Sequence, residues 1–357
     1  MTYKRITQFL LLLACSVAFA FATSCEGPQG PAGTNGIDGE DGINGINGTD
    51  GTPGVAGNAV CMECHNLDTK DRVTNEYHVS GHAAGGAVGY AGNRNDCGMC
   101  HSDQGFRETR YTGVDTMFAA LGGAAQPIQC TTCHDFHESL DFENEMNYAL
   151  RTNDAVALLM YRADDPAAAP VMLDLGDDSN LCTNCHQPRT VPPAGDVDGN
   201  AYISSSHYGP HHGPQSTSLA GLGAYELGTG WPDPGTGSAH AENSSCITCH
   251  MHSADHSWTP SLDACNTTDC HGSMTPLTTY TDNSRQVTFR TNMDVLKVAL
   301  QTAGLLDVDG HPIKGTFGVD SVGAVYNYEW LVDDRSSGVH NLQYTEKMLS
   351  TSLAVFQ

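Results

Sequence analysis

Twelve of the fourteen cysteines form six pairs, and each pair is followed at once by a histidine. Five pairs have two intervening residues, and the sixth pair has four. Cys-x-x-Cys-His is the attachment site of c-type haem. The paired cysteines are Cys61 and Cys64, Cys97 and Cys100, Cys130 and Cys133, Cys182 and Cys185, Cys246 and Cys249, and Cys265 and Cys270. The histidines that follow them, which we expect on the proximal side of iron, are His65, His101, His134, His186, His250 and His271.

The spacing suits the chemistry of haem attachment. Two thiols add across vinyl groups on neighbouring edges of the porphyrin, so they must lie about one turn apart. The adjacent histidine then comes beneath the ring with a nitrogen facing the iron. The stretched pair, Cys265 and Cys270, can do the same if its extra residues bulge outward. The sequence therefore predicts six covalent haems.

Three other uses of cysteine pairs fit less well. Structural zinc sites use Cys-x-x-Cys units but do not need a histidine after each one. Thioredoxin-like redox chemistry needs one such pair in an α/β unit, not six. Disulfides would suit exported cysteines, but partners two residues apart close a scaffold poorly.

Six of the seventeen histidines are proximal, which leaves eleven for other roles. The distal iron ligand of each haem decides between a conductor and an enzyme with an open site. The candidates are His82, His137, His207, His211, His212, His240, His256 and His340. Counting one histidine from the cluster at 207–212, where the choice stays open, gives six for six irons. We expect His78, His252 and His311 at the surface or beside the ligands.

Three stretches resemble known multihaem c cytochromes, those related to cytochrome c nitrite reductase, hydroxylamine oxidoreductase and octahaem tetrathionate reductase. They are Cys130 to His137, His207 to Gly213, and Ala324 to Ser352 around Gly338-Val339-His340-Asn341. The resemblance loosely covers about two-thirds of the mature chain. It implies distal haem ligation by His137 and His340.

The chain also departs from these enzymes. Nitrite reductases of this group place lysine after the second cysteine of the catalytic haem, and no pair here is followed by lysine. Six haems match neither the five nor the eight usual in the group. The resemblance therefore identifies a superfamily rather than an activity.

The elements that hold these motifs are expected to be short. Residues 59–280 carry all six motifs, which leaves little room for a side-chain core. We predict a mainly α domain of short helices and long loops organised around haem, with little or no sheet. Helical patterns at Asn292 to Ala303, Val319 to Val332 and Tyr344 to Val355 predict a segment, 281–357, that packs on the haem domain.

The N-terminus follows different rules. Residues 1–24 resemble an export signal, and Ala22-Thr23-Ser24-Cys25 predicts a lipoprotein anchored through Cys25. A soluble secretory peptide cut nearby is the alternative. Residues 25–58 hold a strict Gly-X-Y period, typical of a collagen triple helix and hence of a homotrimer. An extended monomeric spacer is the other interpretation. The periodic glycines are Gly27, Gly30, Gly33, Gly36, Gly39, Gly42, Gly45, Gly48, Gly51, Gly54 and Gly57.

The charge excludes several partners. Acidic residues outnumber basic ones 41 to 16, so a formal charge of −25 would repel nucleic acid. We expect membrane contact only through the lipid anchor. The Asp-Gly segments at Asp196 and Asp307 lack the glycine and glutamate of a calcium-binding EF-hand, so turns are expected there rather than calcium.

Three functions follow from these observations. The first is electron transfer through six haems with two histidines each, to a redox protein or an extracellular acceptor. The second is reduction of a nitrogen or sulfur oxyanion at one open haem, and the third is a subunit of a haem-lined filament. The sequence favours the electron carrier over the enzyme. We expect an outer-membrane or cell-surface lipoprotein, or otherwise a periplasmic protein.

Overall fold

The computed structural model describes residues 61–62, 64–112, 125–137, 139, 148–161, 169–236, 238–273 and 284–357. The chain divides into two compact units, Met1–Val55 and Ala56–Gln357, and every described residue belongs to the second. The predicted signal peptide, the lipidation site and the Gly-X-Y period all lie outside the described residues.

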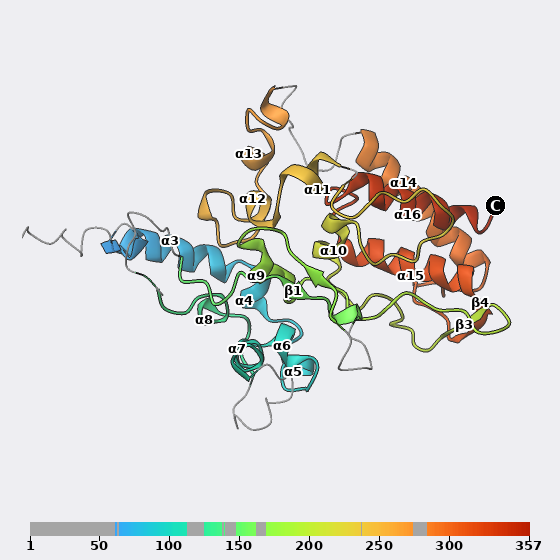
Figure 1. The fold of residues 1–357 in the computed structure, drawn as a ribbon, viewed down its shortest axis with the longest axis horizontal. Helices are drawn as coiled ribbons and strands as arrows, with labels where there is room; N and C mark the ends of the chain where they lie inside the picture. The colour runs from blue at the N-terminus through green and yellow to red at the C-terminus, as the bar shows by residue number, and fades with distance from the viewer. Residues whose placement is uncertain are drawn as a thin grey trace, which may run out of the picture. The chain divides into compact units, whose positions relative to one another are not determined.

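The described chain is mostly helical, as predicted (Figure 1). Its sheet is limited to two antiparallel strand pairs, β1 with β2 and β3 with β4. The strands are β1 Val156–Ala157, β2 Met172–Leu173, β3 Asn200–Ile203 and β4 Gly315–Gly318. The helices are α3 Leu67–His78, α4 Gly81–Ala84, α5 Val88–Ala91, α6 Gly98–His101, α7 Asp103–Thr112, α8 Cys130–Cys133, α9 Ser179–Thr183, α10 Gln215–Ala220, α11 Ala239–Asn243, α12 Cys246–His250, α13 Leu262–Cys265, α14 Ser284–Thr302, α15 Val319–Asp334 and α16 Leu342–Ala354, with 3₁₀ turns η2 Leu159–Tyr161, η3 His252–Ala254 and η4 His271–Ser273.

The three long C-terminal helices α14, α15 and α16 pack together (Figure 1). All three were predicted, although α14 begins at Ser284 rather than Asn292. The side chain of Asn341 caps α16 by accepting a hydrogen bond from the N–H of Tyr344 at 3.2 Å. Arg335 ends α15 in the left-handed conformation, with φ of 57°. Local capping signals thus set the ends of two helices.

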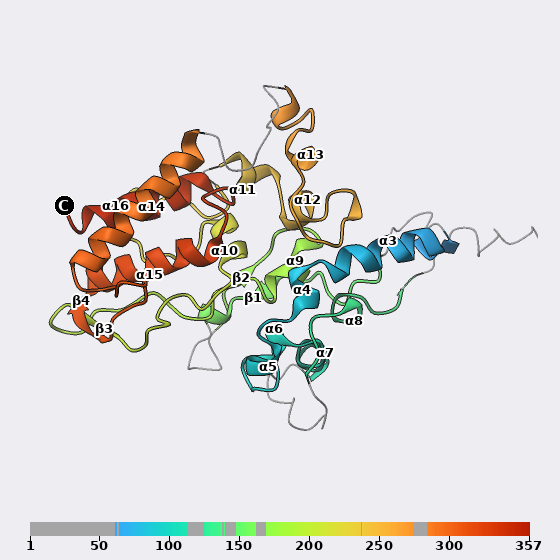
Figure 2. The ribbon, with the colours of Figure 1, turned by 180° about the vertical axis from the view of Figure 1, so that it is seen from behind.

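A single apolar core joins these helices to earlier segments of the chain. Trp330, Tyr344 and Met348 are fully buried in it together with Leu158 and Ile203. The Trp330 indole donates to Ser218 Oγ at 2.8 Å. Strand β3 pairs with β4 across the boundary predicted at residue 280 (Figure 2). We call residues 158–161, 169–236 and 284–357 the core region.

The described residues within 61–135 and within 238–273 are called the motif arms here. Their buried apolar side chains are Ala91, Phe106 and Ala264 among the residues that the structure describes. Polar contacts order them instead: Asp103 accepts from Thr131 and Thr132 at 3.0 and 2.8 Å. The sequence predicts few buried apolar side chains in the haem domain. This prediction is confirmed in the motif arms but is wrong for the core region. None of the described helices has the length and apolar character needed to span a membrane.

Candidate haem-binding sites

The five regular motifs share one backbone geometry, a single helical turn. In each, the histidine comes four residues after the first cysteine, and the two cysteines three apart lie on one side of the turn. In the fifth motif, the whole sequence from Cys246 to His250 forms α12. In the other four, the histidine N–H donates to the carbonyl of the first cysteine: His65 to Cys61 at 2.8 Å, His101 to Cys97 at 3.1 Å, His134 to Cys130 at 2.8 Å and His186 to Cys182 at 3.0 Å.

In the stretched motif, the extra residues between Cys265 and Cys270 form an additional turn. Cys265 ends α13, and the N–H groups of Cys270 and Gly272 both donate to the carbonyl of Thr267, at 3.1 and 2.8 Å. A Cβ on residue 272 would collide with the carbonyl of Asn266, so the residue after His271 must be glycine. The four intervening residues therefore form a separate compact turn before His271.

Five motif histidines each face one of the predicted distal histidines. Two imidazoles on opposite sides of one metal, each bonded at about 2.0 Å, have ring centroids roughly 6.3 Å apart. The observed separations lie close to that value. They are 6.1 Å for His65–His137, 6.1 Å for His82–His186, 6.3 Å for His134–His256, 6.2 Å for His240–His271 and 6.4 Å for His250–His340.

The ring pairs divide into two classes by the angle between their planes. Three pairs are closer to perpendicular, at 82° for His65–His137, 71° for His240–His271 and 64° for His82–His186. Two are closer to parallel, at 39° for His250–His340 and 31° for His134–His256. This angle affects the electronic structure of a bis-histidine haem, so the two classes are distinguishable by spectroscopy.

Hydrogen bonds at Nδ1 orient many of these rings. A carbonyl or carboxylate oxygen only accepts, so its partner Nδ1 carries the proton and Nε2 keeps a lone pair for a metal. The backbone supplies four of these acceptors: Tyr148 to His134 at 2.9 Å, Trp258 to His250 at 2.8 Å, Val339 to His240 at 2.6 Å and Ala254 to His256 at 2.9 Å. The donor set therefore fits axial ligation of haem iron.

Asp333 and Asp334, adjacent at the end of α15, hold two further rings. Asp334 Oδ1 lies 2.7 Å from Nδ1 of His340, and Asp333 Oδ1 lies 3.0 Å from Nδ1 of His212. Burial lowers the pKa of His340, but the Asp334 carboxylate outweighs burial and the net shift is upward. Neither aspartate was recognised from the sequence, because nothing near them in the chain marks them as partners of histidine.

The sixth motif histidine, His101, lies near the histidine cluster. Burial lowers its pKa, and the electrostatic influence of His212 lowers it further. His211 also interacts electrostatically with His101, and its pKa falls to about 4, chiefly through burial. His207 is exposed, and its backbone N–H donates to Ser205 Oγ at 3.0 Å. The structure thus brings His211 and His212 to this motif, and among the described residues it shows no ring partner for His101.

Several motifs touch one another. Cys100 Sγ lies 3.7 Å from the carbonyl of Asn184, and Cys185 Sγ lies 3.6 Å from that of Met99, so the second and fourth motifs meet reciprocally. A hydrogen bond with Cys246 is the largest cause of the raised pKa of Cys182, which joins the fourth and fifth motifs. These contacts place the fourth motif between two others.

Neither a disulfide nor a cysteine-containing metal cluster is found among the described residues. None of the twelve cysteines in this part of the chain forms a disulfide. The one cluster of metal-binding residues found there is Asp307, Asp309 and His311, without cysteine. Asp307 Oδ1 accepts from the N–H groups of Asp309, Gly310 and His311 at 3.0, 2.9 and 2.8 Å. This geometry is the expected Asp-Gly turn.

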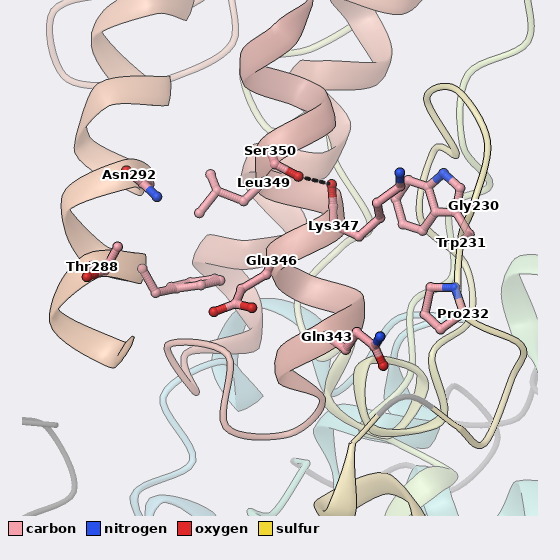
Figure 3. Close-up of a pocket in the computed structure, with 11 residues that line it drawn as sticks. Gly230, Trp231, Pro232, Thr288, Asn292, Gln343, Glu346, Lys347, Leu349 and Ser350 are labelled. Carbon is pink, nitrogen blue, oxygen red and sulfur yellow. Dashed lines mark hydrogen bonds between the residues drawn. The ribbon is translucent and has the colours of Figure 1, made fainter. Parts of the chain in front are cut away.

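A surface cavity of about 640 Å³ lies elsewhere in the core region, between α14, α16 and the segment around Trp231 (Figure 3). The side chains of Trp231, Glu346 and Lys347 contribute to its lining. None of its lining residues belongs to the haem motifs or to the distal candidates.

Two solved structures are similar to this chain, both cytochromes. The outer cell wall cytochrome OcwA is 20% identical with a TM-score of 0.48, and the similarity covers 79% of this chain and 50% of that one. The undecahaem cytochrome from the S-layer of Carboxydothermus ferrireducens is 15% identical with a TM-score of 0.49, covering 77% of this chain and 40% of that one. The chain thus spans half or less of either neighbour. No protein-family model matches it, and no curated protein does.

Proposed function

We propose that this protein is a hexahaem c-type cytochrome that transfers electrons and has two histidines on every iron. The observation that carries this proposal is the set of five histidine pairs separated by 6.1 to 6.4 Å, each joining a motif histidine to a distal candidate. The twelve thiols would hold the porphyrins as thioethers. Haem iron, when bound, supplies a one-electron couple.

The sixth iron would lie between His101 and His212. The Asp333 carboxylate holds Nδ1 of His212, as Asp334 holds that of His340, and leaves Nε2 for the metal. Both carboxylates fix the orientation and the tautomer of a ligand. Two histidines at each of six irons would leave no position open for a substrate, so the haems would then supply electron exchange alone.

One low-temperature electron paramagnetic resonance spectrum of the oxidised protein tests this. The anisotropy of a low-spin ferric haem increases as its two imidazole planes turn from parallel to perpendicular. We expect three strongly anisotropic signals, two rhombic signals and a sixth low-spin signal from the haem at His101. Intact mass should show six covalent haems, and a mass short by one porphyrin would point to Cys265 and Cys270.

A reductase with one open haem is the second candidate, because His101 lacks a facing ring within the described residues. A nitrogen or sulfur oxyanion would then bind iron opposite His101. A high-spin ferric signal that nitrite converts to low spin would favour this enzyme. Its absence, with six low-spin haems, would favour the electron carrier.

The remaining proposals concern location and assembly, and they rest on the sequence. We infer export and anchoring through a lipid on Cys25, with residues 25–58 as a spacer, 59–280 as the haem domain and 281–357 as a helical segment against it. Cys25→Ser should release the protein from the detergent phase.

The Gly-X-Y segment is tested by deleting residues 27–57. If the full chain is a trimer and the deletion variant is a monomer, a collagen-like helix is supported; if both are monomers, the segment is an extended spacer. Redox proteins or an extracellular acceptor would be the partners, and haem-lined filaments in electron micrographs would support polymerisation.

A further inference from the structure

Trp258 contacts three candidate haem ligands from three different histidine pairs. Its ring centroid lies 4.5 Å from that of His82 and 5.7 Å from that of His256. Its backbone carbonyl accepts a hydrogen bond from Nδ1 of His250 at 2.8 Å.

The indole is what orients His82. This histidine is largely enclosed by protein, and burial lowers its pKa to about 4. Its buried Nδ1 has no hydrogen-bond partner among the described residues, unlike Nδ1 of most of the other ligands. The indole meets the imidazole edge to face at 73°, a favourable aromatic geometry. Packing against Trp258 therefore takes the place of a hydrogen bond in setting the plane of this ring.

The loop that carries Trp258, residues 251–260, is held in a conformation that bulky residues rarely adopt. Trp258 has a φ of 54°, and Ser253 and Ala254 have φ values of 58° and 56°. Residues with side chains occupy this left-handed region only where the surroundings enforce it. The loop thus presents both the indole and the carbonyl of Trp258 at a conformational cost.

Helix α3 and the loop itself supply that enforcement. Glu76 Oε2 accepts from the N–H of His256 at 3.0 Å. Asp255 accepts from the N–H of Ser257 at 2.7 Å and from its hydroxyl at 3.0 Å. These bonds fix the backbone on both sides of His256 and hold Trp258 against the ligand rings.

We propose that Trp258 is a positioning residue shared by three haem sites. Its ring sets the planes of His82 and His256, and its carbonyl fixes the tautomer and orientation of His250. One residue thus orients histidines that would bind three of the six irons. This inference rests on the proposed function, since it needs haem at these histidines.

The principal test is Trp258→Leu, which removes the indole but keeps the backbone carbonyl. In the spectrum of the oxidised protein, one signal of each class should shift: the anisotropic signal of His82–His186 and the rhombic signal of His134–His256. The signal of His250–His340 should stay in place. Trp258→Gly also relaxes the left-handed backbone, so that third signal should shift as well.

Trp231→Leu is the matched control. This tryptophan packs on Tyr344 in the core region, with ring centroids 5.4 Å apart, and its indole donates to the carbonyl of Leu227 at 3.2 Å, so its ring contact and hydrogen bond involve none of the candidate ligands. Its replacement should shift no haem signal. A merely structural effect of losing a tryptophan would not select the two signals expected for Trp258→Leu.

Unchanged signals in Trp258→Leu carrying six haems would overturn the inference. If that variant loses haem, Trp258→Phe decides instead, because it keeps a smaller ring. A smaller shift of the same two signals supports the role of Trp258, and unchanged or different signals overturn it. A wild-type protein without covalent haem would be recognised by mass before any variant is made, and would refute the proposed function itself.

Discussion

The core region and the motif arms are stabilised by different interactions. In the core region, aromatic and aliphatic side chains such as Trp330, Tyr344 and Met348 are fully buried against one another. The arms carry five of the six motifs, and their described residues bury Ala91, Phe106 and Ala264 as apolar side chains. Burial of apolar surface is the main favourable contribution to folding. The arms therefore need apolar surface from another source, and covalent porphyrins would provide it.

The largest effect expected from this difference is the response to loss of haem. When the chain is produced without haem maturation, the arms should exchange their amide hydrogens like an unfolded chain, because ligand binding and folding are coupled there. The core region should keep slowly exchanging amides in α15 and α16. Hydrogen exchange followed by mass spectrometry measures both in one experiment. Slow amide exchange in the motif arms of the haem-free chain would show that haem is not needed to order them.

The converse experiment damages the core region alone. Trp330→Ala should lower the free energy of unfolding by about 3–5 kcal/mol, the usual cost of truncating a large buried aromatic residue. The expected result is unfolding of the helices at a lower denaturant concentration, with the low-spin haem signals of the native protein unchanged when no denaturant is present. Trp231→Ala, at a half-buried position, should cost less. Loss of haem signals before helix unfolding would show that the two regions are not separate.

His340 is a candidate link between the regions. It lies between α15 and α16 and faces His250 of the motif arms at 6.4 Å between ring centroids. His340→Ala should convert one low-spin haem to high spin, raise its potential and open a site for cyanide or nitrite. His311→Ala, at an exposed turn, should do neither. An unchanged spin count in His340→Ala would mean that the ligand of this haem lies elsewhere.

The smallest effect is expected from a substitution of Asp334, because its carboxylate contacts the imidazole of His340 and would not itself bind iron. Asp334→Asn keeps an oxygen near Nδ1 of His340 but removes its charge, so the ferric state loses stabilisation. A tenfold change in the relative stability of the two oxidation states corresponds to a rise of about 59 mV in the potential of one haem. Redox titration measures this shift, and Asp309→Asn should leave all potentials unchanged. Asp333→Asn should shift a different haem if His212 binds iron.

Some of the fold was predictable because the signals are local. The helices α15 and α16 follow from periodic apolar residues within one segment, and the largest difference is that α14 begins at Ser284 rather than Asn292. The antiparallel pairing of β3 with β4 had no such signal, because its strands lie far apart in the chain and are four residues each. The contribution of Leu158 and Ile203 to a shared core was missed for the same reason.

By itself, the sequence determined which cysteines and histidines form the six motifs, because each motif lies within a few consecutive residues and the haem attachment it predicts needs only that spacing. It also narrowed the distal candidates to a few histidines. Only the tertiary structure decided which rings face each other, as in His82 with His186, because residues that far apart in the chain come together through long-range packing. The same holds for Asp333, Asp334 and Trp258. Their contacts depend on how α15 and the loop at 251–260 pack, which no spacing in the chain records.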